Sequence, residues 1–161
     1  MRVLGIDPGS AVTGYGIVEK TGSQFRHVDN GTVRTSRSSS FPRRLQEIFF
    51  EIGELILRSR PDVMAVEEVF FAKNPMSALK LGESRGVALL AAAQHNLTVH
   101  EYSTREVKQA VTGYGQASKE QIQKMVRQLL KLPEVATEDA SDALAVAICH
   151  LQSYKIKELT K

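Results

Sequence analysis

The sequence predicts an α/β fold, with a mixed five-stranded sheet and helices on both faces. Three antiparallel strands are expected first, followed by two parallel ones. The first part of the chain alternates apolar and polar residues between short turns, which is typical of antiparallel strands. The remainder switches between short apolar runs and segments of helical period, which is typical of parallel strands joined by helices. The 161 residues, 42% of them hydrophobic, suit a single domain over 1–161 with its own core.

The three N-terminal strands are predicted over Arg2–Asp7, Gly14–Val18 and Phe25–Val33. The turn Pro8-Gly9-Ser10 separates the first two, because proline and glycine favour tight turns. The segment Ser36–Ser40 is polar and rich in serine, so we expect a mobile surface loop there.

The period becomes helical at Pro42, a residue that suits the first turn of a helix, and Pro61 ends this element. The apolar face of the helix consists of Leu45, Ile48, Phe49, Ile52, Leu55 and Ile56. Val63–Val66 is an unbroken apolar run, which predicts a strand buried on both faces. A long helix over Met76–Gln94 and a strand over Leu97–Tyr102 follow.

Two capping boxes, Ser103 with Glu106 and Ser118 with Gln121, predict the starts of the next two helices. A last helix follows, and its surface is apolar on nearly every side. The three helices are predicted over 104–111, 119–131 and 138–154, and the charged tail 155–161 is expected to be frayed.

The charge and cysteine content limit the classes of function. The net charge is +3, and 105–131 holds six basic residues and two glutamates, which fits either a nucleic-acid surface or a solvated helix face. Cys149 is the only cysteine, so an internal disulfide and a cysteine zinc cluster are excluded. Without a signal-peptide pattern or an apolar run long enough to span a bilayer, the chain is expected to be cytoplasmic and independent of membranes.

Two acidic residues stand at the ends of predicted strands. Asp7 precedes a Pro-Gly turn, where it could be an ordinary turn residue or a group at the rim of the sheet. Glu67 ends the apolar run of a buried strand and shares a face with Val63 and Ala65. A buried carboxylate needs a partner or a cation, so the alternatives are a salt bridge at the strand end and a functional site.

Two more acids, Asp139 and Asp142, lie three residues apart on one face of the last helix. Asp139 could simply complement the helix dipole in the first turn, with Thr137 as the cap. Asp142 is surrounded by apolar helical neighbours, including Ala145 and Val146, and is therefore expected to be buried with a partner.

The four acids together predict a metal-dependent nuclease. Clustered carboxylates repel one another and take up protons unless a cation lies between them. Hard divalent ions such as Mg²⁺ and Mn²⁺ prefer oxygen ligands. Two such ions roughly 4 Å apart can stabilise the attacking water and the leaving oxygen of a phosphodiester. None of the four histidines shows a zinc-binding spacing with Cys149.

Several motifs in order resemble the RuvC family of four-way (Holliday) junction resolvases, over roughly Val3 to His150. The motifs are GIDPGS, TGYGIV, VEEVFFAKN, SALKLGESRGVA, REVKQAVTGYG and DASDALAVAICH. The resemblance implies a ribonuclease H-like fold and a homodimer that makes paired cuts in four-way junction DNA during recombination and repair. It also implies Mg²⁺, or Mn²⁺ in its place, with two ions per active site, and suggests a branch-migration motor complex as a partner.

The resemblance also assigns roles to single residues. It places the catalytic metal ligands at Asp7, Glu67, Asp139 and Asp142, although some relatives have histidine at the position of Asp139. It implies functional lysines at Lys108 and Lys119, and a DNA-contacting aromatic ring at Phe70.

The residues alone leave some of these roles open. Either Phe70 or Phe71 could stack on an unpaired base while the other enters the core. Lys119 is in a first helical turn, where the dipole disfavours a cation unless a phosphate is near, whereas Lys108 also fits a solvated surface lysine. The small residues of the helix over 76–94 fit a dimer contact or tight packing on its own sheet.

Three other functions are compatible with parts of the pattern. The Asp-x-Gly-Ser and Thr-Gly motifs also resemble the phosphate loop of sugar kinases and actin-like ATPases, which need two such subdomains. The four acids are equally compatible with a nuclease of the same fold that acts on RNA. A non-catalytic junction-binding module would leave the four acids without a role.

Overall fold

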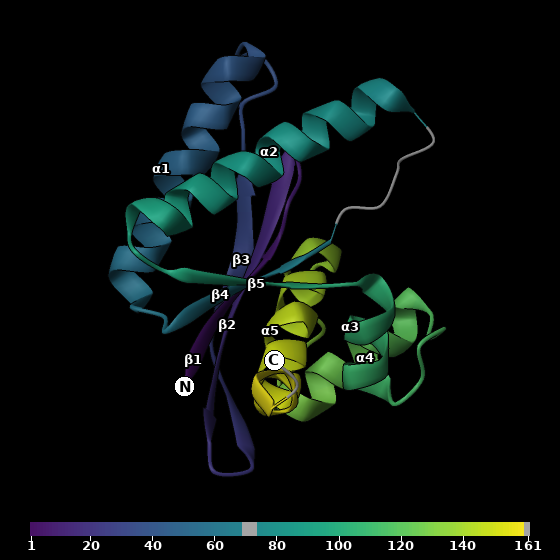
Figure 1. The fold of residues 1–161 in the computed structure, drawn as a ribbon. Helices are drawn as coiled ribbons and strands as arrows, with labels where there is room; N and C mark the ends of the chain where they lie inside the picture. Colours follow the sequence, from purple (N-terminus) through teal and green to yellow (C-terminus); the bar gives the residue numbers. More distant parts are fainter. Residues whose placement is uncertain (69–73, 160–161) are drawn as a thin grey trace.

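A computed structural model describes residues 1–68 and 74–159 of the chain, and its strands form one mixed sheet (Figure 1). The strand order is β3-β2-β1-β4-β5. The pairs β1–β2 and β2–β3 are antiparallel, while β1–β4 and β4–β5 are parallel. The predicted mixed sheet of three antiparallel and two parallel strands is therefore confirmed.

The elements follow the predicted order. The strands are β1 (Arg2–Asp7), β2 (Val12–Thr21), β3 (Gln24–Arg34), β4 (Val63–Glu67) and β5 (Thr98–Tyr102), and the helices are α1 (Phe41–Ser59), α2 (Pro75–Gln94), α3 (Thr104–Thr112), α4 (Lys119–Leu130) and α5 (Glu138–Leu159). Both predicted capping boxes form, at Ser103 and Ser118. No helix in the described part of the chain is long and apolar enough to cross a bilayer.

The predicted end of the last helix was wrong. The helix was expected to end at about Tyr154, but α5 continues to Leu159. The reason is local: Lys155, Lys157 and Glu158 are good helix formers, and no glycine or proline follows Tyr154 to stop the helix.

Helices cover both faces of the sheet, as predicted. On one face, α1 and α2 pack over a cluster that includes Leu4, Ile6 and Met64. On the other face, α5 lies across the sheet, with α3 and α4 beside it (Figure 1). Side chains alternate between faces along a strand, so Val3 and Ala65 face α5. By the same alternation, the last residues of β1 and β4 also belong to the α5 side.

Two glycines allow α5 to lie unusually close to the sheet. A Cβ on Gly5 of β1 would lie 2.0 Å from the Ala143 carbonyl oxygen, and one on Gly14 of β2 would lie 2.0 Å from the Asp139 carbonyl oxygen. Real Cβ atoms do not approach backbone so closely. Because these positions have no side chains, the first two turns of α5 pack directly on β1 and β2. This packing also brings Asp139 and Asp142 close to the sheet.

The serine-rich segment predicted to be a mobile loop is held by hydrogen bonds to α1. The Ser36 backbone N–H donates to Glu47 Oε2 at 3.1 Å, and the Ser39 hydroxyl donates to Glu47 Oε1 at 3.3 Å. Arg44 Nε donates to the Thr35 hydroxyl oxygen at 3.0 Å. These partners lie on the following helix, so the polar composition of the segment alone did not reveal them.

Candidate active site

The candidate site lies where the parallel strands β1 and β4 end side by side. Because these strands pair with Ile6 opposite Val66, the next residues, Asp7 and Glu67, emerge together at the carboxyl edge of the sheet. A cavity of about 420 Å³ opens at this edge. It is lined by Asp7, Pro8, Glu67, Glu68, Leu81, Thr104, Val107, Lys108, Lys119, Ile122, Asp142 and Ala145.

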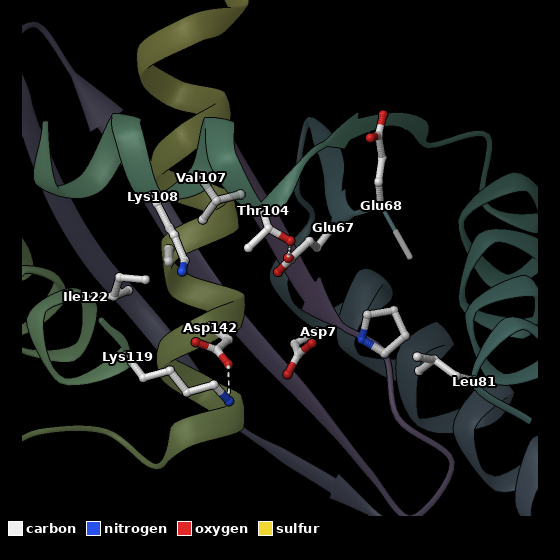
Figure 2. Close-up of a pocket in the computed structure, with 12 residues that line it drawn as sticks. Asp7, Glu67, Glu68, Leu81, Thr104, Val107, Lys108, Lys119, Ile122 and Asp142 are labelled. Atoms are coloured by element: carbon white, nitrogen blue, oxygen red, sulfur yellow. Dashed lines mark hydrogen bonds and ion pairs between the residues drawn. The ribbon is translucent and has the colours of Figure 1, made fainter. Parts of the chain in front are cut away.

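Three of the four predicted acids line this cavity. Figure 2 shows the carboxyl groups of Asp7, Glu67 and Asp142 turned toward a common space, whereas the Glu68 side chain points away from them. Asp142 enters from α5, in which the other residues from 140 to 151 are buried. Residues 7, 67 and 142 are therefore brought together from two strands and a helix.

The electrostatics of this group match the expected repulsion between carboxylates. Burial and, to a smaller extent, the charges of Asp142, Glu67 and Asp139 together raise the pKa of Asp7 to about 7, against a lowering by Lys119. Burial is also the largest cause that raises the pKa of Asp142 to about 6, and the nearby Lys119 opposes it. Two carboxyl groups that resist ionisation in one cavity fit a site completed by a cation.

Asp139 lies at the margin of the group. It is one turn before Asp142 on α5, and its charge raises the pKa of both Asp7 and Asp142, but it does not line the cavity. Within 1–68 and 74–159, no three acidic, histidine or cysteine side chains are close enough to enclose a metal ion. The carboxylates therefore share one electrostatic environment without forming a closed set of ligands.

Both predicted lysines line the cavity. Lys119, at the start of α4, lies 3.9 Å from Asp142 Oδ2 and also pairs with Glu138. The pairing with Glu138 and the charges of Asp142 and Asp7 raise the pKa of Lys119 against the effect of its burial. The acids of α5 thus stabilise the Lys119 ammonium group in the first turn of α4, where the helix dipole disfavours a cation. The sequence did not predict this pairing.

Thr104 is a site residue that the sequence analysis missed. It is the first residue of α3, directly after β5, and its hydroxyl donates a hydrogen bond to Glu67 Oε1 (Figure 2). Its position in the sequence could have identified it. Thr104 follows β5, which is parallel to β4, so it lies at the same carboxyl edge of the sheet as Glu67. Phe70 and Phe71, by contrast, lie outside the described residues.

The arrangement places carboxylates and ammonium groups around one cavity. Such a site suits a substrate with anionic oxygens, because cations and lysines stabilise the charge that develops during phosphoryl transfer. A sheet of order β3-β2-β1-β4-β5 with acids at the ends of β1 and β4 and on α5 defines a ribonuclease H-like nuclease.

Comparisons with known proteins identify the family. Residues 3–150 match the family described as crossover junction endodeoxyribonuclease RuvC, and the chain belongs to this family. A curated relative of the same description from Citrifermentans bemidjiense is 57% identical over 161 residues, which cover all of this chain and 98% of the relative. Membership makes the protein a nuclease that hydrolyses DNA, in agreement with the sequence-based prediction and against the kinase alternative.

Solved structures agree with this assignment. The Thermus thermophilus RuvC structure superimposes with a TM-score of 0.87 at 35% identity, over 98% of this chain and 97% of that one. T. thermophilus RuvC in complex with a Holliday junction substrate gives a TM-score of 0.92 at 36% identity, over 98% and 96% of the two chains. The predicted ribonuclease H-like fold is confirmed.

Proposed function

We propose that this protein resolves four-way DNA junctions by metal-dependent hydrolysis, with Asp7, Glu67, Asp139 and Asp142 as its metal ligands. The observation that carries this proposal is the convergence of Asp7, Glu67 and Asp142 in one cavity, where burial and mutual repulsion oppose their ionisation. The similarity to a T. thermophilus relative in complex with a Holliday junction supports the choice of substrate.

Mg²⁺ is the proposed metal, with Mn²⁺ able to replace it. The donors are carboxylate oxygens, which suit hard divalent ions, and Cys149 is buried away from the site. When bound, two such ions would supply a nucleophilic water and stabilise the leaving oxygen. Asp139, at the margin of the cavity, would complete the ligand set from the first turn of α5.

We propose that other residues bind the DNA or orient a metal ligand. Lys108 and Lys119 line the cavity, and we infer that their ammonium groups contact the phosphates beside the scissile bond. The Thr104 hydroxyl fixes one oxygen of Glu67 and leaves the other free to bind a cation. Phe70 is proposed to stack on a base near the point of strand exchange.

A homodimer is proposed to present two such sites to the two-fold junction. The support comes from exposed apolar side chains on the outer helices. On α2, Leu79 and Leu90 are 61% and 56% exposed and lie eleven residues apart, which places them on one face. On the adjacent α1, Phe50 and Leu57 are 60% and 57% exposed and share a face in the same way. Large apolar side chains exposed on neighbouring helices fit an interaction surface.

A cytoplasmic location and a branch-migration motor as partner are proposed with this function. A junction nuclease acts where the chromosome of a bacterium lies, and the relatives named above are bacterial. A free, buried Cys149 suits a reducing compartment. Cross-linking of the protein to the motor on a junction would test the partnership.

Cleavage by an Asp7→Asn variant tests the proposal. The variant should bind a labelled synthetic four-way junction with the wild-type affinity, because binding depends mainly on phosphate contacts. It should not cut the junction in Mg²⁺, since one carboxylate ligand is lost. Wild-type cleavage by Asp7→Asn would refute the site, and cleavage of structured RNA in preference to the junction would refute the substrate.

A further inference from the structure

We infer that Arg34, Arg37 and Arg43 form a second phosphate-binding surface, which holds the duplex arm of the DNA outside the catalytic cavity. This inference rests on the proposed function, because it concerns the same substrate. Together these three residues make up the basic rim. They lie in a stretch from Arg34 to Gln46 that contains four arginines and no acidic residue.

The position of the basic rim follows from the strand register. Asp7 of β1 is opposite Gly14 of β2, and Arg34 at the end of β3 is opposite Val12. Arg34 is therefore two strands away from Asp7, at the same end of the sheet. With about 5 Å between strands and roughly 3.4 Å per residue, the two Cα atoms are on the order of 12 Å apart. That separation corresponds to only a few nucleotides of duplex.

Hydrogen bonds join the segment to the active-site turn. The Thr35 backbone N–H donates to the Ala11 carbonyl oxygen at 3.2 Å. Arg44 donates to the carbonyl oxygen of Ser10 and, at 3.0 Å, to the Thr35 hydroxyl. Ser10 and Ala11 belong to the turn that follows Asp7, so the segment and the catalytic carboxylate are held by the same backbone.

Helix α2 makes a second connection between the segment and the cavity. The Lys80 ammonium lies 5.8 Å from the centre of the Phe41 ring, at the start of α1. The next residue, Leu81, lines the catalytic cavity. Lys80 therefore adds a basic side chain to the surface between the cavity and the basic rim.

The three arginines are available to a ligand. All are exposed, and none forms an ion pair with an acidic residue of the described chain. The nearest acid in sequence, Glu47, uses both carboxylate oxygens to accept hydrogen bonds from Ser36 and Ser39. These bonds order the loop between Arg34 and Arg43. Cations presented on an ordered loop beside a phosphodiester-cleaving site match the regular phosphates of a DNA arm.

The test compares two triple variants that remove equal charge from β3, α1 and the residues next to them. The rim variant is Arg34→Gln, Arg37→Gln and Arg43→Gln. The control variant is Arg26→Gln, Arg58→Gln and Arg60→Gln, which changes the far end of β3 and the C-terminal end of α1. In the control, Arg26 pairs with Glu19 and Arg58 with Asp29, and both arginines are largely exposed. Exposed pairs of this kind contribute little to stability, so both variants should fold.

Binding to a synthetic four-way junction is measured without divalent metal over a range of salt concentrations. Each phosphate contact contributes about 0.9 to the log–log salt slope, so the rim variant should lose roughly two to three from the slope for each protomer bound, or roughly five for the proposed homodimer, and bind about tenfold more weakly or worse. Arg→Lys at the three rim positions should restore most of the affinity, because phosphate contacts depend on charge. The control variant should keep the wild-type slope.

A wild-type salt slope in the rim variant would overturn the inference, and so would an equal loss in the control variant. Cleavage in Mg²⁺ at saturating junction separates this inference from the proposed function. The rim variant should retain the wild-type turnover, since its catalytic cavity is intact, and a lost turnover at saturation would also contradict a role in binding alone. A wild-type protein that neither binds nor cuts the junction would refute the proposed function itself.

Discussion

The surroundings of Asp7 oppose the ionisation of its carboxyl group. It is enclosed between β1, β4 and α5, and its pKa is raised to about 7. An acid with a raised pKa in the folded state holds a proton that the unfolded chain has already released. The metal-free protein therefore loses stability as the pH rises from the unfolded pKa near 4 to about 7, and the loss is complete above that. A bound cation would reverse this loss, because it favours the ionised form.

Asp7→Asn should therefore stabilise the metal-free protein at high pH. At pH 8 the variant should unfold with a free energy about 1–3 kcal/mol greater than that of the wild type, because it carries no ionisable group at this position. Near pH 4 the two proteins should be equally stable. Urea denaturation in a chelator at both pH values measures this. A destabilised variant at pH 8 would mean that Asp7 is not under repulsion.

Thr104 should matter for catalysis through its hydrogen bond to Glu67. Thr104→Val keeps the shape of the side chain but removes the donor, so Glu67 loses its fixed orientation. The cleavage rate should fall roughly tenfold or more, with a raised Mg²⁺ requirement, as is found for partners that orient metal ligands. Thr104→Ser keeps the hydroxyl and should retain most activity. Equal rates for the valine and serine variants would exclude a positioning role.

At the scale of elements, the site depends on how closely α5 approaches β1 and β2. A Cβ on Gly5 would meet the Ala143 carbonyl oxygen at 2.0 Å, and this oxygen belongs to backbone that cannot rotate away. Gly5→Ala should therefore push α5 outward, cost at least about 1–3 kcal/mol of stability and reduce cleavage by displacing Asp142.

Gly53→Ala in α1 is the matched control for this prediction. Its new Cβ would meet only the end of the His95 side chain, at 3.3 Å, and that side chain can move. Removing a glycine from a helix interior should leave stability unchanged or raise it by up to about 1 kcal/mol. Thermal unfolding of both variants makes the comparison. Equal effects at the two positions would contradict a close contact at Gly5.

The elements themselves were largely predictable from sequence, because each carries a local signal. The capping boxes at Ser103 and Ser118 fixed the starts of α3 and α4, and the apolar run before Glu67 identified a buried strand. Contacts between segments that are distant in the sequence were harder to predict. Thr104 meets Glu67 across 37 residues and Lys119 meets Glu138 across 19, and local pattern does not encode these pairings. The end of α5 was missed because nothing in the sequence stops the helix at Tyr154.

At the scale of the whole molecule, the outer surface of α1 and α2 should determine the oligomeric state. Leu90 is 56% exposed on α2, and a homodimer through this surface would bury it. Leu90→Glu should shift the protein from dimer to monomer in sedimentation experiments, because an uncompensated charge in an apolar interface is costly. Val135→Glu changes an exposed apolar residue before α5 and should leave the dimer intact. An unchanged dimer in Leu90→Glu would place the interface elsewhere.

The convergence of acids from β1, β4 and α5 on divalent ions is tested most directly by a crystal structure in Mn²⁺, with the ions located by anomalous scattering. Mn²⁺ should lie in the cavity within roughly 2.2 Å of carboxylate oxygens of Asp7, Glu67 and Asp142, with Asp139 joining them through a small movement of its side chain. A crystal saturated with Mn²⁺ that shows these carboxylates without an ion between them, and ions bound only elsewhere, would contradict the proposed site.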